Sequence, residues 1–461
     1  MTSTLKYLGV LVVAFLVFSS ALILSSTLVN ANSPISIGRV LGSGIAVDSA
    51  GNIALTGDTA SFGEGGSITY LFKFDSSGKR LCFRTWGPQN YPAREGGSDD
   101  TFGYGVAFDT SNNLYWTGTT MAETHEDYDV FLVKYDSSCN QVYWVGWGAQ
   151  GNDIGRAVAT DASDNLYVTG STSSYGSGQG FVTTDIFLLK YGPSGEFQWS
   201  KTWGGLQNDY GTGMAVDSAG NVYVVGSTES YGGVSDFVLL KYDAYGNLLV
   251  QKVWGGQYND YGTGVAVDSG GNVYMSGYTY SYGPTPGIAS AILVKYDPLG
   301  NQIFAQTWGG EQNTFSTGVS VDAAGNAWVT GYNYGSHPAS AVATAFLLKY
   351  DPSGNLLMEE TWGGNGGDYA YGVAVDNFGN VFETGYTYSF GQNTKGANFF
   401  LLKYDPFGNL IYQVTYGGGI PLTYSTGGAA SIPTPEFDGY FGVIAAICAL
   451  GASFCIRLRK R

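Results

Sequence analysis

Between residues 44 and 418, short apolar runs alternate with turns that are rich in glycine, asparagine and aspartate. One representative stretch has apolar runs at 265–267, 272–275, 292–296 and 302–308. Runs of this length, separated by turn residues, are typical of β-strands rather than helices. The third run is apolar on both faces, which predicts a strand buried between two layers. The pattern therefore predicts units of four short strands, labelled A to D.

Three motifs show that this unit occurs seven times. The first, Gly-x-Ala-Val-Asp-x-x-Gly-Asn, spans the A–B turn and recurs every 51 to 61 residues, with its aspartate at Asp48, Asp109, Asp161, Asp217, Asp268, Asp322 and Asp376. The second, Leu-Leu-Lys-Tyr-Asp, ends strand C and contains Lys73, Lys134, Lys190, Lys241, Lys295, Lys349 and Lys403. The third, Thr-Trp-Gly-Gly, ends strand D in six copies, and Tyr416 replaces the tryptophan in the seventh. A period near 50 residues predicts a solenoid, propeller or array.

Most of these motif side chains are predicted to have structural roles. An aspartate at the first position of a turn caps that turn, and we favour this role over a ring of metal ligands. The residue that needs a positive φ is glycine in most A–B turns, and Asn112 or Asp164 in two others, which tolerate that conformation. We expect the lysines to be solvated amines paired with nearby aspartates, and the tryptophans to pack between units.

The strands together predict an all-β fold, a seven-bladed β-propeller of four-stranded antiparallel blades. Strand A is built from small residues, as the narrow centre of a ring requires, and strand D is more polar, as suits an outer strand. The motifs resemble the SBBP family, named for a seven-bladed β-propeller repeat, over residues 44–418. The resemblance implies this fold and no particular activity, because propellers host many unrelated functions. With no spare strand before the first blade, we expect the first and last blades to meet without sharing a strand.

The N-terminus predicts an export signal. Lys6 precedes an apolar run that extends to Leu24, and a small-residue site ends at Ala31. These features predict a signal peptide over residues 1–31, cleaved after Ala31, followed by a lead-in segment over residues 32–43. An uncleaved N-terminal membrane anchor is the alternative, because the run is long and rich in leucine.

The C-terminus predicts an attachment to the membrane. A linker over residues 419–437 ends in Pro435, Glu436 and Phe437, and residues 438–461 form an apolar stretch with a basic end. This order resembles the PEF-CTERM sorting signal of archaeal surface proteins, which implies an archaeosortase-like processing enzyme and a lipid-type replacement anchor. An ordinary transmembrane helix is the alternative. Either reading adds terminal hydrophobic helices to the propeller and leaves it on the outer face of the membrane.

Composition narrows the possible functions. The chain has 461 residues, 70 of them glycine, with a formal net charge of −16, and residues 32–437 alone hold 16 basic and 36 acidic side chains. Nucleic acid is therefore not an expected partner. The sequence contains no P-loop, Rossmann fingerprint, HExxH or GxSxG motif, so no cofactor and no catalytic residue is predicted, while calcium binding stays open.

The links between strand D of one unit and strand A of the next carry the candidate ligand-binding residues. In four links, an acid lies six residues after the tryptophan, and a tyrosine often follows the acid. In the first link, which is longer, Asp100 is the corresponding acid. The candidates are Asp100, Asp153, Asp209, Tyr210, Asp260, Tyr261, Asp368 and Tyr369. In a propeller these links lie beside the variable, tyrosine-rich B–C loops. We hypothesise a face that binds a glycan, a protein partner or a divalent cation. The alternative is that the aspartates cap link turns and the tyrosine rings cover blade edges.

Two cysteines and the terminal segments complete the prediction. Cys82 and Cys139 belong to neighbouring units and could form a disulfide in an oxidising compartment, although they occupy different positions relative to their turns.

The terminal segments and the repeat together predict an extracellular, cell-surface-anchored propeller that acts as a binding or structural module of the cell envelope. An extracellular hydrolase or lyase that uses carboxylates at the channel mouth is the alternative.

Overall fold

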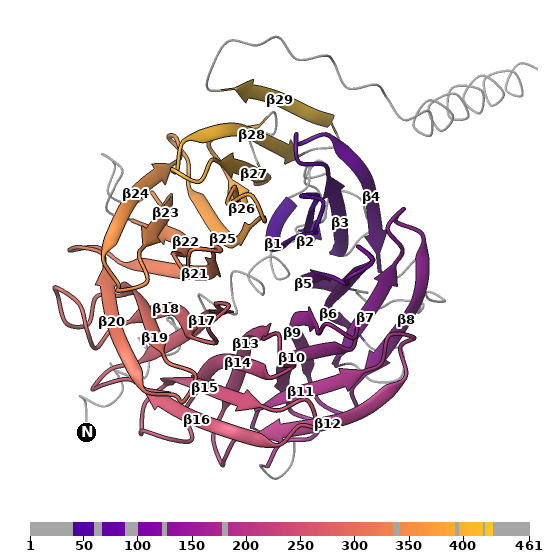
Figure 1. The fold of residues 1–461 in the computed structure, drawn as a ribbon, viewed down its shortest axis with the longest axis vertical. Coiled ribbons are helices and arrows are strands. Elements are labelled where there is room, and N and C mark those ends of the chain that lie inside the picture. Colours follow the sequence, from indigo (N-terminus) through magenta and orange to yellow (C-terminus); the bar gives the residue numbers. More distant parts are fainter. Residues whose placement is uncertain are drawn as a thin grey trace, which may run out of the picture.

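The computed structural model describes residues 40–59, 67–87, 100–121, 127–177, 183–334, 342–391, 396–417 and 420–426. These residues form seven antiparallel sheets around a central axis, which confirms the predicted seven-bladed β-propeller (Figure 1). Within each blade the strands are paired in chain order, from the first strand near the axis to the fourth at the rim. Six blades have four strands, and the last has a fifth strand that the sequence did not predict.

The strand bounds follow the repeat. Blade 1 contains β1 (Val40–Val47), β2 (Ile53–Thr59), β3 (Ile68–Phe74) and β4 (Arg80–Trp86). Blade 2 contains β5 (Thr101–Phe108), β6 (Leu114–Met121), β7 (Tyr128–Tyr135) and β8 (Gln141–Trp147), and blade 3 contains β9 (Asp153–Thr160), β10 (Leu166–Thr172), β11 (Asp185–Tyr191) and β12 (Phe197–Trp203). Blade 4 contains β13 (Asp209–Val216), β14 (Val222–Thr228), β15 (Asp236–Tyr242) and β16 (Leu248–Trp254), and blade 5 contains β17 (Asp260–Val267), β18 (Val273–Thr279), β19 (Ser290–Tyr296) and β20 (Gln302–Trp308). Blade 6 contains β21 (Thr314–Val321), β22 (Ala327–Asn333), β23 (Thr344–Tyr350) and β24 (Leu356–Trp362), and blade 7 contains β25 (Asp368–Val375), β26 (Val381–Thr387), β27 (Asn398–Tyr404), β28 (Leu410–Gly417) and β29 (Ile420–Thr426).

The A–B turns are capped by their own aspartates, as the sequence predicts. In blade 5, Asp268 Oδ1 accepts hydrogen bonds of 2.9 Å from the backbone N–H groups of Gly270 and Asn272. The residues expected to need a positive φ have one, including Asn112 at 61° and Asp164 at 60°. Because the turn chemistry is local, the copies with asparagine or aspartate at this position form the same turn as the copies with glycine, and the blade does not change.

The strand-C lysines join neighbouring blades, and this corrects their prediction as solvated amines. Lys295 is only 4% exposed, and its Nζ donates a hydrogen bond of 2.7 Å to the carbonyl oxygen of Pro352 in the next blade. The Nζ atom also lies 4.6 Å from the ring centroid of Tyr274, within cation–π range. Lys73, Lys134, Lys190, Lys241, Lys349 and Lys403 make the same contact with the following C–D turn.

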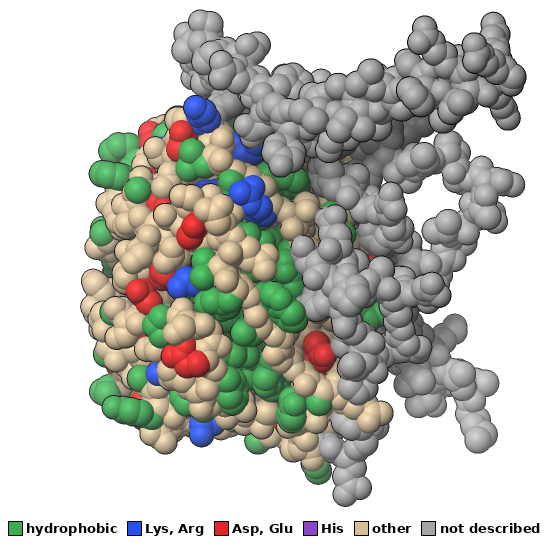
Figure 2. Space-filling view, turned by 90° about the vertical axis from the view of Figure 1, so that its right-hand side faces the viewer, with side chains coloured by type: hydrophobic (Ala, Val, Ile, Leu, Met, Phe, Trp, Pro, Cys, Tyr) green, Lys and Arg blue, Asp and Glu red, His purple; other side chains and the backbone are tan. Residues whose placement is uncertain are grey.

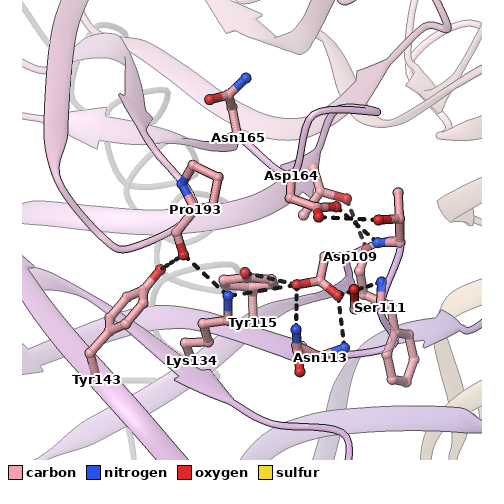
Figure 3. Close-up of polar contacts among 12 residues, drawn as sticks. Asp109, Ser111, Asn113, Tyr115, Lys134, Tyr143, Asp164, Asn165 and Pro193 are labelled. Atoms are coloured by element: carbon pink, nitrogen blue, oxygen red, sulfur yellow. Dashed lines mark hydrogen bonds and ion pairs between the residues drawn. The ribbon is translucent and has the colours of Figure 1, made fainter.

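Figure 3 shows this junction between blades 2 and 3. Lys134 extends toward the Pro193 carbonyl oxygen, at 3.1 Å, and lies beside the Tyr115 ring and the Asp109 carboxylate of its own blade. Tyr143 Oη also approaches the Pro193 carbonyl oxygen, at 3.5 Å. Each lysine, buried or half-buried, donates to a backbone carbonyl oxygen of the next blade, so these lysines act as inter-blade ties.

Aromatic and covalent contacts also connect neighbouring blades. The Trp86 ring at the end of β4 lies 4.2 Å, between centroids, from the Phe131 ring in blade 2, so this tryptophan packs between blades as expected. A disulfide links Cys82 in β4 to Cys139 in the C–D turn of blade 2. Cys139 has a φ of 65° at the position where other copies have glycine.

The ring closes without a shared sheet. In the described strands, blade 1 and blade 7 form separate sheets, which confirms the expectation from the sequence. An apolar cluster spans the join and includes Leu55 and Phe72 from blade 1 with Phe399 and Leu401 from blade 7. Lys403 Nζ donates a hydrogen bond of 2.8 Å to the Ser76 carbonyl oxygen, so the last lysine tie also crosses the join.

Several boundaries differ from the sequence-based prediction. Strand A has eight residues and begins at the link aspartate, because that residue pairs in register with the end of strand B, as Asp260 does with Thr279. The first strand begins at Val40, inside the expected lead-in segment, and β29 falls within the expected linker. The terminal hydrophobic helices, Ala31 and the Pro435–Phe437 motif lie outside the described residues. Across the part of the chain that the structure describes, no helix is long and apolar enough to cross a membrane.

The rim is less polar than expected of an outer strand. Leu81, Val142 and Trp144 are exposed on β4 and β8, and Figure 2 shows hydrophobic side chains gathered in a band over this side of the molecule. The other face of each outer strand packs inward, so the alternation of a half-buried strand is kept.

Candidate functional site

The link aspartates lie beneath the surface of one face of the ring, called the loop face, where the B–C loops and D–A links lie. Asp153, Asp209, Asp260 and Asp368 are each the first residue of strand A, and all four side chains are fully buried. Asp100 precedes β5, and its Oδ1 accepts a hydrogen bond of 2.7 Å from the Ser67 backbone N–H. Their places in the structure are therefore at strand starts rather than within open loops.

These aspartates fasten the B–C loop to the D–A link. Asp209 Oδ2 accepts hydrogen bonds from the Gly205 backbone N–H at 2.9 Å and from Ser230 Oγ at 2.7 Å. The same pair of donors reaches Asp153, Asp260 and Asp368 through Ser174, Ser281 and Ser389. These contacts agree with the capping alternative, and they leave Oδ1 as the atom with spare capacity.

The link tyrosines are half-buried on the same face. Burial raises the pKa of Tyr210 and of Tyr261 to about 12, so both are neutral hydroxyls near neutral pH. The Tyr261 ring stacks on Tyr278 at 5.0 Å, and the Tyr369 ring stacks on Tyr386 at 4.8 Å. The link tyrosines thus stack on Tyr278 and Tyr386, which lie within strand B. The sequence analysis had expected the tyrosine-rich segments to lie in the B–C loops.

Blades 5 to 7 share a larger aromatic group, called the aromatic surface. A Tyr-x-Tyr pair ends strand B in each of these blades, and the rings of each pair are edge-on, 5.8 to 6.1 Å apart. The pairs are Tyr278 with Tyr280, Tyr332 with Tyr334, and Tyr386 with Tyr388. Phe315, Tyr369 and Tyr371 connect them across the blade boundaries. The first tyrosine of the pair is buried in blades 5 and 6, as Tyr278 and Tyr332. Tyr388 in blade 7 is 50% exposed, so part of the aromatic surface is open to solvent.

Sequence reasoning missed three acids at the starts of the C strands. Asp129, Asp185 and Asp236 each face the link aspartate of the following blade, across the glycine that follows the strand-D tryptophan. A usable signal exists, because an acid stands five residues before the strand-C lysine only in blades 2, 3 and 4. Burial raises the pKa of Asp185, and the nearby Asp209 carboxylate adds to this shift.

The remaining loop aromatics cover the tryptophans. Tyr282 Oη donates to the Gly255 carbonyl oxygen at 2.9 Å, and its ring lies 4.9 Å from the Trp254 ring. Tyr175 and Tyr231 take equivalent positions over Trp147 and Trp203. Phe62 lies outside the described residues. Among the described residues, no group of three or more His, Cys, Asp or Glu side chains is placed to hold a metal ion.

Comparison with known proteins supports the repeat. A family model described as a beta-propeller repeat, SBBP, matches residues 95–122, 198–232 and 251–283. A WD repeat-containing protein of Acanthamoeba polyphaga mimivirus is 22% identical over 68% of this chain and 31% of its own length. The regulatory protein FlaEY of Caulobacter vibrioides is 33% identical over 22% of this chain and 12% of its own. The chain spans less than a third of the length of either relative.

Solved structures of other propellers show weak likeness. A puromycin hydrolase is 10% identical with a TM-score of 0.48, covering 86% of this chain and 57% of its own. An ulvan lyase is 10% identical with a TM-score of 0.45, covering 70% and 83%. The propeller domain of the trilobed protease from Pyrococcus furiosus is 8% identical with a TM-score of 0.43, covering 83% and 95%. No functional conclusion rests on these likenesses. Three segments of this chain therefore match the SBBP beta-propeller repeat, and the described residues form a seven-bladed propeller.

Proposed function

We propose that this chain is an exported, cell-surface-anchored propeller that acts as a binding or structural module of the cell envelope. The observation that carries the proposal is the aromatic surface, which is confined to three of seven equivalent blades. Where blades 5 to 7 have Tyr280, Tyr334 and Tyr388, with matching backbone hydrogen bonds, blades 3 and 4 have Ser173 and Glu229. The lysine contact with the next blade does not require this asymmetry, because all seven blades form it.

A glycan is the ligand class that best suits the aromatic surface. Tyrosine rings offer flat apolar contact area for sugar rings, and their hydroxyl tips offer hydrogen bonds. The acidic character of residues 32–437 would repel a polyanion, so a neutral envelope polysaccharide is favoured over an acidic one. A protein partner remains the second ligand class for the same surface.

The course of β29 supports an outward-facing loop face. This strand runs antiparallel to β28 and returns the chain to the end of the blade that carries the A–B and C–D turns, as the pairing of Thr426 with Tyr412 shows. The described chain stops at Thr426, and we propose that the tether to the expected membrane segment at residue 438 starts from this turn end. A propeller held in this way presents its loop face, with the aromatic surface, away from the membrane.

Binding of purified full-length chain to immobilised envelope polysaccharides tests the ligand proposal. Replacing Tyr280, Tyr334 and Tyr388 together with alanine should weaken binding by at least tenfold, because stacked rings carry most of such contacts. Tyr245→Ala is the matched control, since Tyr245 is 81% exposed in a C–D turn at the opposite end of a blade. Equal loss in the control, or no polysaccharide binding by the unaltered chain, would contradict the proposal.

The anchor can be tested separately. Mass spectrometry of the protein from its native membrane should find the chain ending before residue 438 if an archaeosortase-like enzyme processes it. An intact Arg461 would refute processing and leave the transmembrane alternative. The enzyme alternative has less support, because the closest described carboxylate pairs, such as Asp185 with Asp209, are buried beneath the loop face.

A further inference from the structure

Three successive blade junctions contain a pair of facing carboxylates. At the junction of blades 3 and 4, a Cβ on Gly204 would clash with Asp185 Oδ1 and stand 2.6 Å from Asp209 Oδ2. Gly255 has the same relation to Asp236 and Asp260, and Gly148 to Asp129 and Asp153. The glycine thus leaves the space in which the two carboxylates approach each other. The next junctions lack the pair, since Ser290 and Thr344 take the place of the strand-C acid.

The strand-C acids Asp185 and Asp236 each have one carboxylate oxygen without a hydrogen-bond partner. Asp185 Oδ2 accepts hydrogen bonds from the Ser177 backbone N–H at 2.7 Å and from Ser177 Oγ at 2.9 Å, but Asp185 Oδ1 accepts none. Asp209 Oδ1 and Asp236 Oδ1 are also buried without a hydrogen-bond partner. Asp185, Asp209 and Asp236 are 2%, 0% and 6% exposed, so solvent does not replace the missing donors. Asp185 Oδ1 and Asp236 Oδ1 are also the atoms that point across the glycine toward the other acid.

In the Asp185–Asp209 and Asp236–Asp260 pairs, two buried carboxylates face each other and need a positive charge between them. A shared proton would neutralise only one acid of a pair. A divalent cation between the two acids neutralises both charges and contacts Asp185 Oδ1 and Asp209 Oδ2, the oxygens nearest to the space that Gly204 leaves open.

We infer that the carboxylate pairs Asp129–Asp153, Asp185–Asp209 and Asp236–Asp260 are divalent-cation sites that tie adjacent blades together. Calcium is the ion that fits this chemistry, because it takes carboxylate, hydroxyl and backbone carbonyl oxygens in flexible geometry. Each pair supplies two carboxylates, and the surrounding loop backbone and serine hydroxyls offer further oxygens. This inference does not depend on the proposed glycan binding, because the pairs lie in blades 2 to 5 and the aromatic surface lies in blades 5 to 7.

Calcium titration of the full-length chain, purified in mild detergent and stripped with EDTA, tests the sites. Isothermal titration calorimetry should find about three ions per chain with dissociation constants of about 0.1–1 mM, as in extracellular calcium modules. Calcium should also raise the melting temperature, whereas sodium chloride at equal ionic strength should not. In the double variant Asp185→Asn with Asp236→Asn, the stoichiometry should fall to about one.

Asp368→Asn is the matched control. Asp368 has the same serine and backbone donors as Asp209, but it faces Thr344 rather than an acid, and its Oδ1 accepts a hydrogen bond from Thr387. This variant should lose turn stability and keep the full calcium stoichiometry. If the control loses calcium as the double variant does, the assignment of the sites is wrong.

The unaltered chain keeps the test independent of whether the variants fold. Absence of calcium binding to it at millimolar concentration overturns the inference. So does a melting temperature that rises as the pH falls from 7 to 5 with no response to calcium, because that result identifies shared protons in place of the ions.

Discussion

Glu383 in β26 is a buried carboxyl group that should make the protein less stable as the pH rises. Its Oε2 accepts a hydrogen bond of 3.1 Å from Tyr404 Oη, and its Oε1 contacts Thr330 Oγ1, which also lies 3.2 Å from the Phe346 carbonyl oxygen. Thr330 has one proton to donate, so both of its contacts are satisfied only when Glu383 is protonated and donates to it. The other blades have an apolar residue at this position, such as Met275.

The magnitude follows from the pKa of Glu383. Burial raises it from 4.5 to about 7, because the ionised form loses its hydration, and the hydrogen bonds from Thr330 and Tyr404 only partly oppose this shift. A raised pKa means that the folded state binds more protons, so this stabilisation is complete below pH 4.5 and is lost as the pH rises through 7. The total loss is about 3 kcal/mol, and roughly 2.5 kcal/mol of it falls between pH 5 and pH 8.

Urea denaturation of the unaltered chain and of Glu383→Gln at several pH values measures this effect. Glutamine copies the protonated acid, since its amide can donate to Thr330 and its oxygen can accept from Tyr404. The variant should therefore match the unaltered chain near pH 5 and exceed its free energy of unfolding by roughly 2–3 kcal/mol at pH 8. Glu360→Gln, at an exposed position of β24, controls for the change in net charge. A difference between the chain and Glu383→Gln that is constant from pH 5 to pH 8 would refute the reasoning.

Three further predictions concern the contacts between blades. Cys82→Ser should lower the free energy of unfolding by about 4 kcal/mol, because the bridge closes a loop with a sequence separation of 57 residues; dithiothreitol should destabilise the unaltered chain equally, and no effect of the reductant would contradict this. Lys295→Met should cost about 1–3 kcal/mol by leaving the Pro352 carbonyl oxygen without its donor, while Lys201→Met, at an exposed position, should cost less than about 0.5 kcal/mol in the same thermal denaturation assay. Hydrogen exchange should be faster in β1 and β25 than in the strands of blade 4, because no D–A link joins blade 7 to blade 1 as it joins the other neighbouring blades. Equal protection would show that side-chain packing closes the ring as firmly as the chain links do.

The repeat itself made the fold predictable. Turn chemistry is local, so Asn112 and Asp164 could be assigned a positive φ from their positions in the motif. The same locality explains the predicted capping by Asp268 and its equivalents. By contrast, the role of Lys295 could not be foreseen, because its acceptor in Pro352 lies 57 residues away and belongs to another blade.

The candidate site was only partly predictable for the same reason. The sequence singled out Asp209 and Asp260 by their constant distance from the tryptophan, but a regular spacing along the chain does not indicate depth. The structure buries both carboxylates and places Asp185 and Asp236 opposite them, because strand C of one blade and strand A of the next begin at the same level of the ring.

The sequence by itself determined the number of blades, the four repeated strands of each blade and the residues that form the turns. These follow from periodicity and from backbone preferences that act within a few residues. Only the tertiary structure decided which side chains meet across blade boundaries: the lysine ties, the paired carboxylates and the aromatic surface. Such contacts depend on how neighbouring blades are aligned in the ring, and a repeating pattern along the chain does not specify that alignment.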